Sequence, residues 1–78
     1  MQEFWIRLNS MEDVEEFVAI ATSRAFPICV RDSQHKIRGG SFMEMFCLDF
    51  NQPLRVVVQC SEEELEALCA DAGKFLVK

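Results

Sequence analysis

The segment Leu54-Arg55-Val56-Val57-Val58-Gln59-Cys60 carries the clearest strand signal in the chain, because β-branched residues fill its centre. Alternate side chains of a strand point to opposite faces of a sheet. The pattern therefore predicts an inward face made of Leu54, Val56, Val58 and Cys60. A strand of this kind indicates a sheet with at least one buried face.

Three shorter segments elsewhere in the chain are also predicted to be strands. Residues 4–8 alternate, with Phe4, Ile6 and Leu8 on one side and Trp5 on the other. Residues 28–31 and 36–38 flank the polar turn at residues 32–35, a pattern typical of a hairpin. The sheet is therefore expected to contain four strands.

Apolar residues recur at helical spacing in the remaining segments. A first helix is predicted over residues 11–24 and a short second one over residues 41–48, and a third begins near Glu62. The residue before Pro27 avoids the α region, so the first helix ends ahead of it. The three apolar stripes are Val14, Phe17, Val18, Ala21 and Ala25; Phe42, Met45 and Phe46; and Leu65, Leu68, Cys69, Ala72, Phe75 and Leu76.

The element order β-α-β-β-α-β-α, with one apolar stripe on each helix, predicts an α+β protein. We expect a two-layer open-faced sandwich, in which three helices cover one face of a four-stranded antiparallel sheet and the other face stays solvated. At 78 residues the chain is expected to form a single domain, residues 1–78.

The composition limits the classes of partner. Eight basic and thirteen acidic residues give a net charge of −5, the wrong sign for binding nucleic acid. No apolar run approaches the roughly 20 residues of a membrane span, so we expect a cytoplasmic protein. Four cysteines, Cys29, Cys47, Cys60 and Cys69, form no C-x-x-C pair, which favours reduced, mostly buried thiols over a redox or metal role. No metal or other cofactor is expected.

Serine–acid pairs open all three predicted helices: Ser10 with Asp13, Ser41 with Glu44, and Ser61 with Glu64. At this spacing the pair is typical of a capping box, in which serine and acid bond each other's backbone N–H groups. Further acids follow the first and third caps, at Glu12, Glu15, Glu16, Glu62, Glu63 and Glu66. They either complement the helix dipoles or form an acidic docking patch.

The element order and the caps, taken together, resemble the HPr family, the small phosphocarrier proteins of the bacterial sugar phosphotransferase system. Phe17-Val18 is similar to that family's Phe-Val pair, and Gly40-Ser41-Phe42-Met43-Glu44-Met45 is similar to its regulatory serine motif. One ungapped offset serves both segments, and the resemblance extends over essentially the whole chain.

The resemblance implies a phosphorylatable histidine at the start of the first helix, and this sequence departs there. Ser10 matches the histidine, Glu12 the arginine that neutralises the phosphoryl group, and Asp13 the following proline. Serine cannot form a labile phosphoramidate, and the adjacent carboxylates repel an incoming phosphoryl group. The resemblance therefore implies a divergent member that transfers no phosphate. The sequence offers no nucleophile–base pair, metal cluster or glycine-rich phosphate cradle, so we do not expect an enzyme.

The regulatory segment keeps the family pattern. Ser41 matches the serine that HPr kinase modifies, with Arg38 nearby to pair with a phosphate. Phe42, Met43 and Phe46, with Glu12, match the surface where partner proteins dock, so phosphotransferase-system enzymes or HPr kinase are the implied partners. On the alternative interpretation, Ser41 only caps a helix and Phe42, Met45 and Phe46 pack the core.

The sequence thus leaves three alternative functions open. The first is a regulatory or binding protein in the bacterial cytoplasm; the second is a small-ligand sensor that dimerises through its sheet and buries Trp5. A phosphocarrier that uses an unconventional residue is a third alternative. His35, the only histidine, lies in a polar turn and is not expected to replace the missing one.

Overall fold

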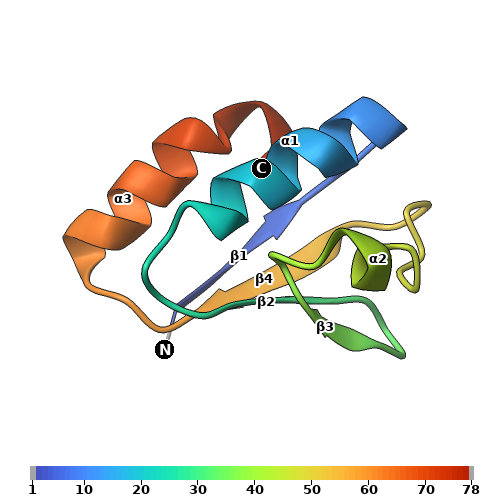
Figure 1. Cartoon of the computed structure of the whole chain (residues 1–78), viewed down its shortest axis with the longest axis horizontal. Helices are drawn as coiled ribbons and strands as arrows, with labels where there is room; N and C mark the ends of the chain where they lie inside the picture. The colour runs from blue at the N-terminus through green and yellow to red at the C-terminus, as the bar shows by residue number, and fades with distance from the viewer. Residues whose placement is uncertain (1, 78) are drawn as a thin grey trace.

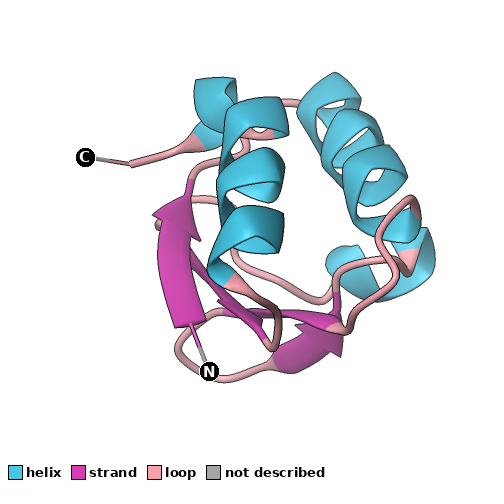
Figure 2. Cartoon of the chain, turned by 90° about the vertical axis from the view of Figure 1, so that its left-hand side faces the viewer, coloured by secondary structure: helices cyan, strands magenta, loops and turns pink. Residues whose placement is uncertain are grey.

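Helices lie on one face of a four-stranded antiparallel sheet in the computed structural model, which describes residues 2–77 (Figures 1 and 2). The predicted α+β open-faced sandwich is confirmed. The strands are β1 (Gln2–Ile6), β2 (Ile28–Arg31), β3 (Lys36–Arg38) and β4 (Leu54–Val58). The helices are α1 (Met11–Thr22), α2 (Phe42–Met45) and α3 (Glu62–Asp71), and a 3-10 turn, η1 (Gly73–Phe75), follows α3.

The strand order is β1-β4-β2-β3, which places β4 between β1 and β2. In the antiparallel register Val56 lies opposite Phe4 on one side and Val30 on the other. The next row along the strands joins Arg55 to Trp5 and to Arg31, and Arg31 in turn to Lys36. Paired residues on β1, β4 and β2 therefore point to the same face of the sheet.

The core forms where α1 and α3 cover the inward side of the sheet. Leu54, Val56 and Val58 are fully buried, so the predicted inward face of β4 is confirmed, while Cys60 lies past the strand end and is half-buried. Phe17 of α1 is completely buried and meets Phe75 edge to face, with ring centroids 6.4 Å apart. Within residues 2–77 no helix is long and apolar enough to cross a membrane.

Only one of the three predicted capping boxes is complete. The Ser61 hydroxyl accepts the Glu64 N–H, and the Glu64 carboxylate accepts the Ser61 N–H. At α1 the Asp13 carboxylate reaches one residue further and accepts the Asn9 N–H at 2.9 Å. At α2 the Glu44 carboxylate instead accepts from the Arg38 guanidinium at 3.3 Å. Ser10 and Ser41 still cap their helices, but without the reciprocal bond.

Two predicted helices extend too far at their C-terminal ends, the first by two residues and the second by three. The first ends at Thr22 rather than residue 24, because the Thr22 and Ser23 hydroxyls donate to backbone carbonyls of the preceding turn, a competing bond that weakens a helix end. Ala25 is therefore exposed and leaves the predicted stripe. The second helix ends at Met45 rather than residue 48, and tighter i→i+3 bonds carry the chain on to Leu48.

All four cysteines are free, but the expectation that they are mostly buried is wrong. Cys29, Cys60 and Cys69 are only partly covered, and Cys47 is exposed. Cys29 sits at an outward position of β2, and Cys47 lies in the turn after α2, so neither reaches the core. Burial raises the pKa of the Cys60 and Cys69 thiols, which keeps them protonated and unreactive near neutral pH.

The Asp32 carboxylate ties the β2–β3 turn to the loop that leads into β4. It accepts the Gln34 N–H at 2.7 Å and the Asp49 N–H at 2.9 Å, and it also bonds His35. These hydrogen bonds hold the pKa of Asp32 well below its ordinary value, and the bond from the Gln34 N–H has the largest effect. Burial acts in the opposite direction and raises the pKa. The ionised carboxylate is therefore part of the folded structure.

We predict that Asp32→Asn lowers the free energy of unfolding at neutral pH. We also predict that this free energy then decreases less when the pH is lowered. Because the pKa of Asp32 is depressed on folding, the stabilisation is present above its ordinary pKa of about 4 and fades as the pH falls below that value. Urea unfolding at several pH values measures this, with Glu66→Gln, an exposed carboxylate, as the control. An acid dependence in Asp32→Asn equal to that of the unmodified protein would contradict the prediction.

Candidate functional site

The start of α1 and the end of α2 meet across a shallow apolar groove of about 260 Å³. Ser10, Met11 and Val14 line it from the α1 side. Phe46 and Phe50 line it from the segment that begins at the end of α2. The structure thus brings Ser10 and Phe46, two of the predicted site residues, to one place.

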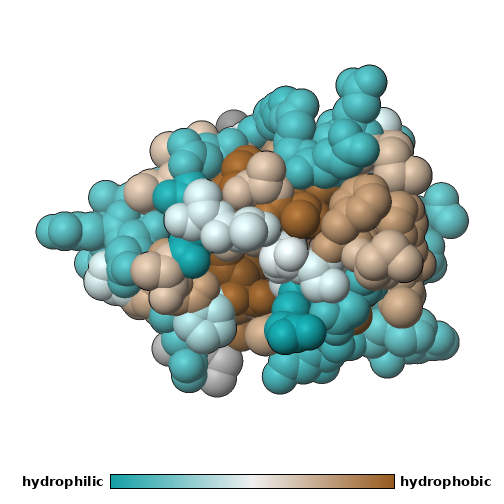
Figure 3. Space-filling view, in the orientation of Figure 1, coloured by the Kyte–Doolittle hydropathy of each residue, from teal (hydrophilic) through white to brown (hydrophobic). Residues whose placement is uncertain are grey.

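Large apolar side chains stand exposed around this groove. Met43 is 77% exposed, Met11 54% and Phe46 46%. Phe42 is half-buried and meets Phe46 edge to face, with ring centroids 5.0 Å apart. Figure 3 shows apolar atoms gathered on this side of the molecule, over α2 and the start of α1. We call these residues, Met11, Phe42, Met43, Phe46 and Phe50, the α1–α2 surface.

The apolar residues of the short helix divide between core and surface. Met45 is completely buried and anchors α2 to the protein, as the core-packing alternative requires. Phe46 and Met43 are exposed, so packing of the core does not explain them. An exposed cluster of aromatic and methionine side chains is typical of a protein-binding surface.

Ser10 is the N-cap of α1, and its hydroxyl accepts the Asp13 N–H at 3.2 Å. The first turn that follows contains two carboxylates, Glu12 and Asp13. No arginine or lysine is among the residues that line the groove. A phosphoryl group on Ser10 would therefore share the first turn of α1 with two carboxylates, and the residues that line the groove supply no cation to neutralise it.

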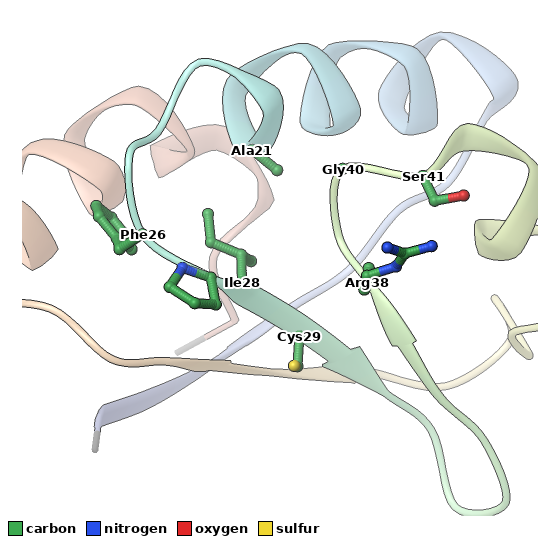
Figure 4. Close-up of a pocket in the computed structure, with 8 residues that line it drawn as sticks. Ala21, Phe26, Ile28, Cys29, Arg38, Gly40 and Ser41 are labelled. Atoms are coloured by element: carbon green, nitrogen blue, oxygen red, sulfur yellow. The ribbon is translucent and has the colours of Figure 1, made fainter.

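Ser41 lies on the rim of a separate pocket of about 470 Å³, beneath the end of α1, which Arg38 and Gly40 also line (Figure 4). Its hydroxyl is half-buried and accepts the Glu44 N–H at 3.4 Å. Figure 4 shows the Arg38 side chain extending to the same side as the Ser41 hydroxyl, toward α2. The Arg38 guanidinium is largely exposed and contacts only Glu44 among its possible ion-pair partners in residues 2–77.

The remaining sequence candidates lie elsewhere. His35 occupies the β2–β3 turn, where its Nδ1 is 3.3 Å from the Asp32 carboxylate, and it lines a different hollow with Cys47. Trp5 is 48% exposed on the open face of the sheet, on the side that sequence alternation predicts. Across the part of the chain that the structure describes, no group of three metal-ligating side chains comes together.

Comparison with known proteins supports the fold. No protein-family model and no curated protein matches the chain. The crystal structure of HPr-C-His from Thermoanaerobacter tengcongensis is similar to it, with a TM-score of 0.72 and 22% sequence identity. The match covers 97% of this chain and 100% of that chain. The chain therefore has an HPr-like fold.

Proposed function

We propose that this protein is an HPr-like regulatory protein that binds protein partners through the α1–α2 surface and carries no phosphoryl group on Ser10. The observation that carries the proposal is the groove shared by Ser10 and Phe46, because it joins the two segments that resemble the functional sites of the HPr family. The groove keeps its apolar surroundings and lacks the histidine and the basic residue that phosphoryl transfer needs.

The chemistry of Ser10 supports the loss of transfer. A phosphoserine is a stable ester, whereas onward transfer from a carrier needs a labile phosphoramidate. The Ser10 hydroxyl is also engaged as a helix cap, and Glu12 and Asp13 repel a phosphoryl group at this position. A carrier function through another residue lacks support, since the only histidine lies in the β2–β3 turn and lines a different hollow.

The α1–α2 surface supports a binding function. Aromatic and methionine side chains provide large contact areas, and residues of these types dominate the energetics of many interfaces. Met43 on α2 and Phe46 directly after it stand exposed, while the buried Met45 between them fixes the helix. Glu12, which follows Met11 at the start of α1, provides a charged rim. The proposed partners are enzymes of the phosphotransferase system or HPr kinase, in the bacterial cytoplasm.

Ser41 is the proposed regulatory site. Arg38 is close enough to Glu44 to pair with it and is free to turn toward a phosphate on Ser41 instead. Such an exchange would replace one carboxylate partner by a doubly charged phosphate and would change the charge beside Phe42. Phosphorylation would therefore alter the α1–α2 surface without rearranging the sheet.

The alternative, a ligand sensor that dimerises sheet to sheet, receives less support from the surface charges. Arg55, Arg31 and Lys36 lie side by side in one outward row of the sheet. In a symmetric dimer through this face, the two rows would face each other, and like charges in contact oppose association. A buried Trp5 in a dimer would favour the sensor nonetheless.

We predict that HPr kinase and ATP add one phosphate to this protein, and that Ser41→Ala removes the modification. Intact mass spectrometry measures both. The Ser41 hydroxyl acts as a cap, so the variant should lose about 1 kcal/mol of stability and stay folded, which circular dichroism checks. No added mass in the unmodified protein would reduce Ser41 to a helix cap and remove HPr kinase from the partners.

We further predict that Met43→Asp slows this modification, since a charge at the most exposed apolar side chain disrupts docking. The expected decrease in the rate is about tenfold, equivalent to roughly 1.4 kcal/mol of lost binding. Val77→Asp is the matched control, because Val77 is also exposed but lies at the other end of the chain, bonded to β1. Equal rates for the two variants would show that the α1–α2 surface does not dock the kinase.

A further inference from the structure

One row of outward side chains crosses all four strands of the sheet. Trp5 of β1 lies opposite Arg55 of β4, Arg55 lies opposite Arg31 of β2, and Arg31 lies opposite Lys36 of β3. The row therefore places one aromatic side chain beside three adjacent cations. Like charges directly opposite each other on neighbouring strands destabilise a sheet, so folding alone does not explain the row.

Most of this positive charge is unneutralised. Glu3 pairs with Arg55 from the neighbouring row and is the only acid at an outward position of the four strands. Within residues 2–77, Arg31 and Lys36 take part in no ion pair, and both are exposed. The rest of the protein has the opposite character, because the net charge is −5 and acids open both α1 and α3.

The surface along the row is hollowed rather than flat. A depression of about 520 Å³ is lined by Glu3, Lys36 and Val57, among others. A second one of about 250 Å³ is lined by Trp5, Asp32 and Pro53, among others. Arg31 and Arg55 line both depressions and stand between them. The result is an elongated site with three cations along its length and an indole at one end. Each depression also has one carboxylate in its lining, but Glu3 is paired with Arg55 and Asp32 accepts backbone N–H groups.

We infer that this open face of the sheet binds a short acidic segment of a partner protein, in extended conformation, across the strands. Neighbouring strands lie about 4.8 Å apart, so the row is about 14 Å long, and an extended peptide presents about three side chains to it over that length. Carboxylates match the guanidinium groups of Arg31 and Arg55 in bidentate pairs. An apolar side chain at one end of the segment would pack against Trp5.

The charges favour a protein segment over the other anions of the cell. A nucleic acid would extend beyond the row into the field of a protein of net charge −5, and its bases would find a single aromatic side chain to stack on. A small carboxylate would contact one depression only. This site lies on the sheet face opposite the helices, so it is independent of the α1–α2 surface and of the proposed function.

Trp5, the only tryptophan, makes the site directly measurable, because a ligand on the row changes its fluorescence. The probe is an acetylated, amidated peptide of sequence Leu-Ser-Glu-Ser-Glu, which places leucine and two carboxylates on one side when extended. Its neutral twin carries glutamine for glutamate. Oligothymidylate of the same length serves as the nucleic-acid probe. Sedimentation equilibrium of the unliganded protein reports self-association.

The expected result is that the acidic peptide shifts Trp5 fluorescence, that added salt weakens the binding, and that the neutral twin does not bind. Lys36→Glu should weaken binding about tenfold, because it removes a charge-assisted bond. Lys74→Glu is the control, since it makes the same charge change at an exposed lysine outside the row. Circular dichroism verifies that both variants are folded.

Four outcomes would overturn the inference. They are failure of the acidic peptide to bind, equal weakening by Lys36→Glu and Lys74→Glu, tighter binding of oligothymidylate than of the peptide, and a dimer that buries Trp5 before any ligand is added. The third would identify a nucleic-acid site and the fourth a contact between two copies of this chain. The first three bear neither on whether Ser41 is modified nor on whether the α1–α2 surface docks a partner, whereas the fourth would favour the sensor as the function of the protein.

Discussion

The alternation of side chains along β4 determines which side of the sheet is buried and which is exposed. β4 pairs with β1 on one side and β2 on the other, so its inward residues Leu54, Val56 and Val58 fix the inward side of the whole sheet. A shift of one residue in register would drive Arg55 into the core, and that cost specifies the pairing strongly. The same alternation decides what the open face displays. The buried core and the outward row that contains Arg31 therefore both follow from this alternation.

The helices form the α1–α2 surface on the other side of the molecule. α1 buries Val14 and Phe17 against the sheet, which leaves Ser10 and Met11 at its exposed end. α2 is too short to be stable by itself and is held by Met45 and the half-buried Phe42, while Met43 remains exposed and able to contact a partner. The protein thus has two candidate binding faces of different chemistry, apolar on the helix side and cationic on the sheet side.

The sequence predicts the parts of this structure that depend on local patterns. The strand at β4, the hairpin turn and the serine caps follow from alternation, turn chemistry and side-chain hydrogen bonding. The reciprocal half of two capping boxes fails because competing groups, the Asn9 N–H and the Arg38 guanidinium, take the carboxylates. The cross-strand row could not be predicted, since the order β1-β4-β2-β3 sets which residues become neighbours. The proximity of Ser10 to Phe46 follows from the resemblance to the HPr family and not from periodicity, which carries no information between distant segments.

We propose that the HPr-like fold of this protein serves for binding and not for phosphoryl transfer. The most direct test is to incubate the protein with phosphoenolpyruvate and the first enzyme of the phosphotransferase system, beside a histidine-containing HPr, and to measure acid-labile phosphate. We expect the HPr to become labelled and this protein to stay unlabelled, because Ser10 is a helix cap followed by Glu12 and Asp13. Acid-labile phosphate on this protein would refute the loss of transfer and would show that another residue has taken over the carrier function.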